Sequence, residues 1–183
     1  MAEPRNRYSS VSLAFHWGIA LAVLAQILLI TVRESIEGPM ARELLAIHKA
    51  LGITILVLTL ARLLWRFANP ALPLPTGTPS WQKAAARTTH ALFYVLLIAI
   101  PVFGWVSSSA GGRDIDIFGL FNWPLLSVEG GRETAGFYMD LHRAAVKGLY
   151  VLLALHVLAG LKHHFVDRDN VLHRMIPLIP RRP

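Results

Sequence analysis

The 183-residue chain contains no cysteine. That absence excludes disulfides, iron–sulfur clusters, thiolate metal sites and haem attached through cysteine. Charged residues are also scarce, at 16% of the chain, whereas 54% of the residues are hydrophobic and the mean hydropathy is +0.48. This composition lies outside the range of ordinary soluble domains. The net charge of +7 would suggest nucleic acid in a soluble protein, but here the basic residues flank apolar runs, which favours a membrane protein.

Four apolar runs are each about 20 residues or longer, the length needed to cross roughly 30 Å of hydrocarbon as a helix. Helices are expected because they satisfy their own backbone hydrogen bonds where water is absent. The sequence therefore predicts an all-α integral membrane four-helix bundle, folded as a single domain over residues 1–183. The predicted spans are about 13–32, 44–64, 84–106 and 137–165.

The first run follows two basic residues, Arg5 and Arg7, as a secretory signal would. Its apolar stretch is too long for a signal and no small-residue cleavage site follows, so we expect a retained span. The two termini and the second connection together carry eleven basic and three acidic residues, including Arg181 and Arg182 and the acidic Glu3. The opposite side carries seven basic and eight acidic residues. The excess of basic residues predicts that both termini are cytoplasmic in a bacterial inner membrane.

The third connection, residues 107–136, is long and contains six glycines. It also carries Phe118, Phe121 and Trp123, aromatic residues of the kind that sit at the membrane–water interface. We expect this connection to reach that interface on the outer side.

Histidines carry the strongest functional signal, because ionisable residues inside membrane spans are costly and usually functional. His142 and His156 lie fourteen residues apart in the fourth predicted span. At about 3.5 residues per turn in a left-handed bundle, fourteen residues make four turns, so both imidazoles face the same way. The rise between them is roughly 21 Å, which places them near opposite membrane surfaces.

Each of these imidazoles has a candidate partner at matching depth in another span. His48 lies about one turn into the second span from the outer side, as His142 does in the fourth. His16 lies about one turn into the first span from the cytoplasmic side, at the level of His156. The sequence thus predicts an outer pair, His48 with His142, and an inner pair, His16 with His156.

Two neutral imidazoles facing each other across a bundle suit the two axial positions of a haem iron. Filling both positions leaves no site for dioxygen, so electron transfer is favoured over oxygen binding. Three alternatives stay open: hydrogen-bonded packing histidines, a zinc or copper site, and replacement of His16 by His90, which enters the third span at the inner level.

Two basic residues are candidates for binding haem propionates. Arg62 follows His48 by fourteen residues, so it shares its face but lies at the inner level. A buried arginine requires an anion, and a propionate would supply one; the alternative is that Arg62 extends to the cytoplasmic headgroups. Lys49 is the corresponding candidate at the outer level, although it points about 100° away from His48.

Several segments resemble the bacterial cytochrome b561 family, and most closely its superoxide oxidase (superoxide:ubiquinone oxidoreductase) branch. They are HWGIALAV, HKALGITILVLTLARLLWR, HALFYVLLIAIPVFGW, LHVLAGLKHHF and DNVLHRMIP, which together extend roughly from Tyr8 to Pro177. The resemblance implies two non-covalent haems b, with His16, His48, His142 and His156 as the axial ligands. It also implies that electrons from superoxide enter near the outer haem and reach ubiquinone from the inner haem. The quinone pocket of the family would fall on His163, Arg168 and Asp169.

The sequence leaves a second function open. A four-span cytochrome of this kind also serves as the b-type subunit that passes electrons between a periplasmic redox partner and the quinone pool, and the loop 107–136 would then be the docking surface. His163 and its neighbour His164 are equally open to interpretation, as plain interfacial residues or as part of the quinone pocket.

Overall fold

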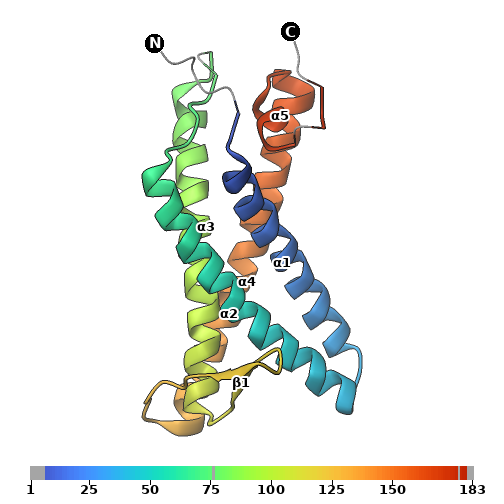
Figure 1. Cartoon of the computed structure of the whole chain (residues 1–183), viewed down its shortest axis with the longest axis vertical. Coiled ribbons are helices and arrows are strands. Elements are labelled where there is room, and N and C mark those ends of the chain that lie inside the picture. Colours follow the sequence, from blue (N-terminus) through green and yellow to red (C-terminus); the bar gives the residue numbers. More distant parts are fainter. Residues whose placement is uncertain (1–6, 76, 177, 181–183) are drawn as a thin grey trace.

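The computed structural model describes residues 7–75, 77–176 and 178–180 (Figure 1). Four residues of the charge prediction lie outside the described residues: Glu3, Arg5, Arg181 and Arg182. Pro177, which ends the last of the resembling segments, lies outside them as well.

Four long helices dominate the described chain: α1 (Ser10–Glu34), α2 (Pro39–Ala68), α3 (Ser80–Ala110) and α4 (Gly131–Lys162). Each is long and apolar enough to cross a membrane. The predicted all-α membrane bundle is therefore confirmed. Each helix extends beyond its predicted span at the end where it begins, because the first turns are polar and fall outside the apolar run.

The helix starts follow from local sequence. Ser9 caps α1 by accepting a hydrogen bond on its side chain from the Ser12 N–H at 3.2 Å, which satisfies one of the free donors of the first turn. α2 begins with Pro39, whose fixed φ suits the first helical position and whose missing N–H costs nothing there. Gly38 before it has φ +84°, a conformation that glycine adopts without strain.

The helices pack in chain order, α1 on α2, α2 on α3 and α3 on α4. The molecule is thus two helical hairpins placed against each other through α2 and α3 (Figure 1). At the centre, buried side chains of α1, α2 and α4 form one apolar cluster, made of Ile19, Val23, Ile55 and Leu149.

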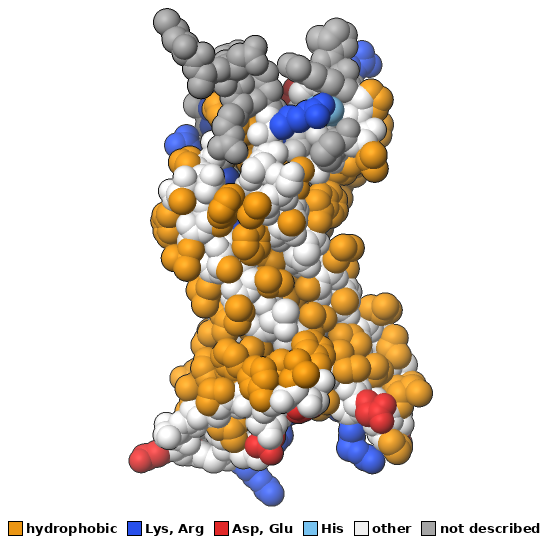
Figure 2. Space-filling view, in the orientation of Figure 1, with side chains coloured by type: hydrophobic (Ala, Val, Ile, Leu, Met, Phe, Trp, Pro, Cys, Tyr) orange, Lys and Arg blue, Asp and Glu red, His pale blue; other side chains and the backbone are white. Residues whose placement is uncertain are grey.

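The outer faces of the helices are apolar and exposed. Figure 2 shows hydrophobic side chains over the middle of the molecule, with charged side chains gathered at its two ends. Leu21, Leu28 and Leu64, for example, are each more than 60% exposed. In a soluble protein such a belt would promote association, whereas in a bilayer it is the surface that contacts lipid.

A small β-hairpin lies in the third connection, where no strand was predicted. β1 (Ile115–Ile117) pairs with β2 (Phe121–Trp123) in antiparallel register, with Ile115 opposite Trp123. The turn contains Phe118 at φ +53° and Gly119 at φ +75°. Phenylalanine rarely adopts such a φ. Hairpin turns of this kind are usually recognised by an Asn-Gly or Asp-Gly pair, and here the pair is Phe-Gly, which gives no such signal.

The hairpin is fixed to the bundle. Ile115 is only 2% exposed, and β1 packs against α2. The ammonium group of Lys49 in α2 donates a hydrogen bond to the backbone carbonyl of Asp114, just before β1. We call this end of the molecule the hairpin side.

The opposite end, which we call the termini side, holds the start of α1 and the last elements of the chain (Figure 1). A π-helical turn, η1 (His163–Asp167), continues α4 and is followed by the short helix α5 (Val171–Met175). The Trp17 indole donates to the Met175 carbonyl at 2.9 Å, and Arg7 contacts His173 at 3.3 Å. These contacts fix the carboxyl-terminal segment onto α1.

Candidate functional site: two imidazole layers

On the hairpin side, α2 and α4 bring two imidazoles next to each other. The ring centres of His48 and His142 lie 6.2 Å apart, and their planes are inclined at 71°. The two residues are separated by 94 positions in the sequence, and they come from different helical hairpins of the bundle. The depth match expected for this pair is present in the structure.

The orientation of His142 is fixed by the neighbouring helix. Its Nδ1 lies 2.9 Å from the carbonyl oxygen of Ile100 in α3. A carbonyl can only accept, so Nδ1 carries the proton and donates it. In a neutral imidazole the other nitrogen, Nε2, then has a free lone pair, which is the form that a metal ligand requires.

His48 is held through its backbone. The side-chain amide of Gln26 in α1 donates from Nε2 to the His48 carbonyl at 2.9 Å. The contact joins α1 to α2 at the level of the imidazole pair. No function was predicted for Gln26, whose only signal in the sequence was a polar side chain within a largely apolar run.

On the termini side, three imidazoles surround one position of the bundle. The ring centre of His156 in α4 lies 6.3 Å from that of His16 in α1 and 5.9 Å from that of His90 in α3. Phe93, one turn after His90, covers the His156 ring at 5.2 Å. The expected pairing of His16 with His156 is present in space, and His90 is an equally near neighbour.

Arg62 lies beside the His16–His156 layer on the termini side. Its Nη2 is 3.4 Å from Nδ1 of His16. Among the described residues no carboxylate lies within salt-bridge distance of this half-buried guanidinium. A cation in such a place calls for an anionic partner, so Arg62 suits a carboxylate from a bound group.

The spacing of each pair can be compared with the size of a metal bridge. A metal atom held between two imidazole nitrogens would keep the two ring centres roughly 6 Å apart, since each metal–nitrogen bond is about 2 Å. The measured separations are 6.2 Å and 6.3 Å. The residues present therefore fit a haem that would be held between two histidines in each layer, and the 5.9 Å separation of His90 from His156 fits in the same way.

A site that binds zinc would need a larger ligand set. In the part of the chain that the structure describes, one group brings three ligating side chains within 4.8 Å, and it is His163 with Asp167 and Asp169. The imidazole layers form no such group, which favours a planar cofactor with two axial ligands over a small cation.

Between the layers lies the apolar cluster. Leu149 follows His142 by seven residues and precedes His156 by seven, while Ile55 lies midway between His48 and Arg62 in the same way. Both are buried, so the same faces of α2 and α4 that carry the functional side chains also point inward at the centre. This confirms the common face of His142 and His156 on which the prediction of two layers depended.

Lys49 lies near the hairpin-side layer, where its ammonium group donates to the Asp114 carbonyl. An ammonium group has three N–H donors, and this contact uses one of them among the described residues. The propionate contact suggested from the sequence remains a prediction for this residue.

Two of the three residues suggested for a quinone pocket are in contact. Nδ1 of His163 lies 2.7 Å from a carboxylate oxygen of Asp169, and Arg168 between them is exposed, in the left-handed region at φ +54°. The π-helical turn and this left-handed residue fold Asp169 back towards His163. Asp167 also faces His163 at 3.4 Å and forms an ion pair with Lys162 at 2.6 Å.

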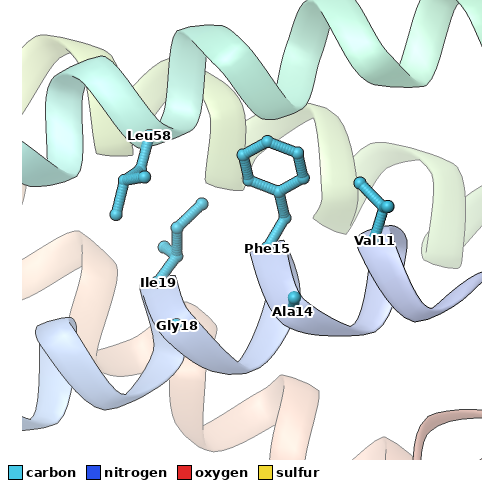
Figure 3. Close-up of a pocket in the computed structure, with 6 residues that line it drawn as sticks. All are labelled: Val11, Ala14, Phe15, Gly18, Ile19 and Leu58. Carbon is cyan, nitrogen blue, oxygen red and sulfur yellow. The ribbon is translucent and has the colours of Figure 1, made fainter.

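An apolar groove of about 330 Å³ lies between α1 and α2. Figure 3 shows Phe15 and Ile19 of α1 directed towards α2, where Leu58 completes the lining. The lining side chains repeat at helical spacing, Val11, Ala14, Phe15 and Gly18, and His16 is not among them. Since these side chains offer no polar atom, the groove has no part in binding a metal or an anion.

One further residue, near the His48–His142 layer, was not identified from the sequence. Arg33, close to the end of α1, has a buried Nε without a hydrogen-bond partner among the described residues. An arginine at the boundary of a span reads as an ordinary interfacial residue, so the sequence carried no signal that would distinguish it.

Comparison with known proteins agrees with this geometry. Residues 7–178 match the family described as prokaryotic cytochrome b561. The chain belongs to that family. It is 35% identical over 174 residues to cytochrome b561 homolog 2 of Escherichia coli K12, covering 93% of this chain and 92% of that protein.

Two further relatives extend over a similar length. Cytochrome b561 homolog 1 of E. coli K12 is 28% identical over 176 residues, covering 94% of this chain and 98% of that protein. A Yersinia pestis protein named "Probable superoxide oxidase CybB" is 29% identical over 172 residues, covering 94% and 97%. As a cytochrome b561, the chain is a bacterial membrane protein of a family that binds haem b and transfers electrons.

Proposed function

We propose that this cytochrome b561 carries two non-covalent haems b and transfers electrons from superoxide to ubiquinone. His48 and His142 would be the axial ligands of one haem, and His16 and His156 those of the other. The observation that carries the proposal is the presence of two imidazole pairs with ring centres 6.2 Å and 6.3 Å apart in one bundle. When bound, each haem would supply one-electron redox chemistry.

The choice of superoxide and ubiquinone as substrates is supported by the family resemblance and by the relative from Y. pestis, whose printed name is that of a superoxide oxidase. The reaction balances as two superoxide anions, one ubiquinone and two protons giving two dioxygen molecules and one ubiquinol. Each superoxide loses one electron, so two passages through the bundle complete one quinone reduction.

The charge distribution gives the direction. The excess of basic residues on the termini side favours both termini in the cytoplasm of a bacterial inner membrane, and the hairpin side would then lie in the periplasm. Superoxide would then be oxidised near the His48–His142 layer. Electrons would leave from the His16–His156 layer, with Arg62 balancing the charge of a haem propionate there.

The quinone would bind at the end of α4, near His163, Arg168 and Asp169. The contact between His163 and Asp169 supports this assignment, because a carboxylate on Nδ1 fixes the imidazole and leaves Nε2 for a ligand oxygen. Arg168 is exposed beside them and offers further hydrogen-bond donors.

Reduction by superoxide tests the function directly. The protein purified in detergent should show a b-type spectrum with two haems per chain. A substoichiometric amount of superoxide should reduce it, and a ubiquinone analogue should oxidise it again. Superoxide dismutase added beforehand should prevent the reduction, which controls for direct reduction by the generating system.

A spectrum that stays unchanged on adding superoxide would exclude this substrate while leaving the two haems in place. Asp169→Asn tests the quinone assignment separately. It should slow reoxidation by quinone at least about tenfold without altering reduction by superoxide. Asp140→Asn is the matched control, since Asp140 forms an exposed ion pair with Arg143 on the hairpin side.

The hairpin supports a second candidate function, that of a b-type subunit receiving electrons from a periplasmic protein. Phe118, Leu120 and Phe121 are 52%, 78% and 53% exposed around the hairpin turn. Exposed apolar side chains at one place suit a protein interface. Copurification of a redox protein that is lost in a Phe118→Ser/Phe121→Ser variant, together with an absence of reduction by superoxide, would favour this function.

A further inference from the structure

Two helix carbonyls in the hairpin-side layer share a local arrangement that the proposed function does not explain. The Ile100 carbonyl accepts a hydrogen bond from the His142 ring, and the His48 carbonyl accepts one from the Gln26 amide. In both cases the donor comes from an adjacent helix. In both cases the residue four positions after the carbonyl is a glycine, Gly104 or Gly52.

The position of these glycines explains why the carbonyls are accessible. A helix carbonyl points towards the residue four positions later, and the side chain of that residue tilts back over it. A side chain there would cover the second lone pair of the oxygen. Glycine leaves the lone pair open to a donor from outside the helix.

The distances at Gly104 show how tight this approach is. A methyl group added at Gly104 would lie 3.3 Å from Nδ1 of His142, the atom that donates to Ile100, and 3.5 Å from Cε1. At Gly52 an added methyl would lie 3.4 Å from Nε2 of Gln26, again the donating atom. Other span glycines differ, since an atom added at Gly18 or Gly148 meets nothing within 4 Å.

We propose that Gly104 and Gly52 are positioning residues for the hairpin-side layer, which act by opening the Ile100 and His48 carbonyls to the His142 ring and the Gln26 amide. This inference rests on the proposed haem ligation by His48 and His142. The first contact fixes the ring and the tautomer of His142, and the second fixes the backbone that carries His48.

The two contacts also hold the architecture. Gln26 joins α1 to α2 and His142 joins α4 to α3, so each helical hairpin is tied internally at the level where it presents its imidazole. The two imidazoles then meet across the boundary between hairpins at 6.2 Å. A shift of either backbone would change the spacing that an iron with two axial ligands requires.

The contact on His142 has an electronic consequence. An imidazole that donates Nδ1–H to a carbonyl becomes a stronger electron donor through Nε2. Stronger donation stabilises the ferric iron and lowers its reduction potential. With haem bound, the Ile100 carbonyl would therefore lower the potential of the hairpin-side haem, and weakening the contact should raise it.

The test compares Gly104→Ala with Gly148→Ala, a substitution into open space in α4. Each variant is purified with haem and titrated potentiometrically, and its low-spin electron paramagnetic resonance signals are recorded. Gly104→Ala should shift the hairpin-side haem to higher potential and change its resonance signal, while the termini-side haem stays unchanged. Gly148→Ala should match the unsubstituted protein in both measurements.

Gln26→Leu tests the second contact, because it keeps the volume of the side chain and removes the donor. Haem should dissociate from the hairpin-side layer about tenfold or more faster, the usual cost of losing a group that supports a metal ligand. Gly18→Ala in the same helix serves as the control. Equal dissociation rates in Gln26→Leu and the control would overturn the role given to Gly52 and Gln26.

The measurements on Gly104→Ala distinguish a failure of this inference from a failure of the proposed function. Two haems with identical potentials and signals in Gly104→Ala and the unsubstituted protein would overturn the positioning role and leave the ligands intact. If a variant binds no haem, nitrogen-15 nuclear magnetic resonance of histidine-labelled haem-free protein tests the contact between His142 and the Ile100 carbonyl. The Nδ1–H signal of His142 should be present in the unsubstituted protein and altered by Gly104→Ala; its absence from the former overturns the inference.

Discussion

An imidazole inside a bilayer is costly unless its polar atoms find partners, and in this cytochrome b561 the neighbours of the imidazoles come from other helices. His142 has the Ile100 carbonyl and faces His48, while His156 is surrounded by His16, His90 and Phe93. The helical spacing and the depth of the histidines predicted that His48 would meet His142 and that His16 would meet His156. The structure brings both pairs together, with His90 equally near His156. Their role as ligands remains a prediction that substitution must test.

Substitution of the hairpin-side histidines should remove one haem only. His48→Ala and His142→Ala should each lower the haem content by about half, because the remaining imidazole cannot hold the iron alone. The pyridine haemochrome assay and the reduced-minus-oxidised spectrum measure this. His164→Ala, in η1 where the ring of His164 packs on Phe165, should keep both haems. Loss of the other haem instead would invert the assignment of the layers.

The termini-side layer calls for a comparison between two neighbours of His156. If His16 is the ligand, as we propose, His16→Ala should lower the haem content by about half, whereas His90→Ala should keep both haems. Spectra of the two variants, recorded at equal protein concentration, answer the question. The reverse result would assign the axial position to His90, which lies 5.9 Å from His156.

The contacts that hold these histidines in position could not have been predicted from the sequence. Gln26, Gly52 and Gly104 lie in apolar runs where an amide or a glycine has many explanations, and their role depends on which helix packs alongside. The same holds for the neighbourhood of His163 and Asp169, which a regular α-helix would keep apart. A π-helical turn followed by a left-handed residue brings them together.

At the scale of elements, the four spans followed directly from apolar length, and their polar first turns account for the differences at the helix starts. The β-hairpin could not be predicted from the sequence. Strands of three residues are too short to show an alternation of apolar and polar residues, and the turn has Phe118 where asparagine or aspartate would be usual. Its attachment to α2 depends on one buried side chain, Ile115, and on the contact of Lys49 with Asp114.

That attachment can be weakened selectively. Ile115→Ala removes a side chain that is 2% exposed, at a cost of about 2–4 kcal/mol. The population of the detached hairpin should rise more than about tenfold, since 1.4 kcal/mol corresponds to a factor of ten. Limited proteolysis in detergent should therefore cut the third connection faster. Leu120→Ala, where the side chain is 78% exposed, should leave the cleavage rate unchanged.

At the scale of the whole molecule, the charge asymmetry predicts which end faces the cytoplasm. The chain has no cysteine, so single cysteines report accessibility without background. Ser127→Cys on the hairpin side should react with a membrane-impermeant maleimide in spheroplasts. Ser80→Cys, at the start of α3 on the termini side, should react only after permeabilisation; both residues are exposed. Labelling of Ser80→Cys in intact spheroplasts would reverse the orientation.

The packing of two helical hairpins bears on how the protein is made. On the proposed ligand set, α4 provides an imidazole to both layers, His142 to one and His156 to the other. Neither iron can acquire its second axial ligand until this last span has left the ribosome and entered the bilayer. Cofactor loading would then be a late, post-insertional step in biogenesis, and a chain truncated before residue 131 would be unable to mature at either centre.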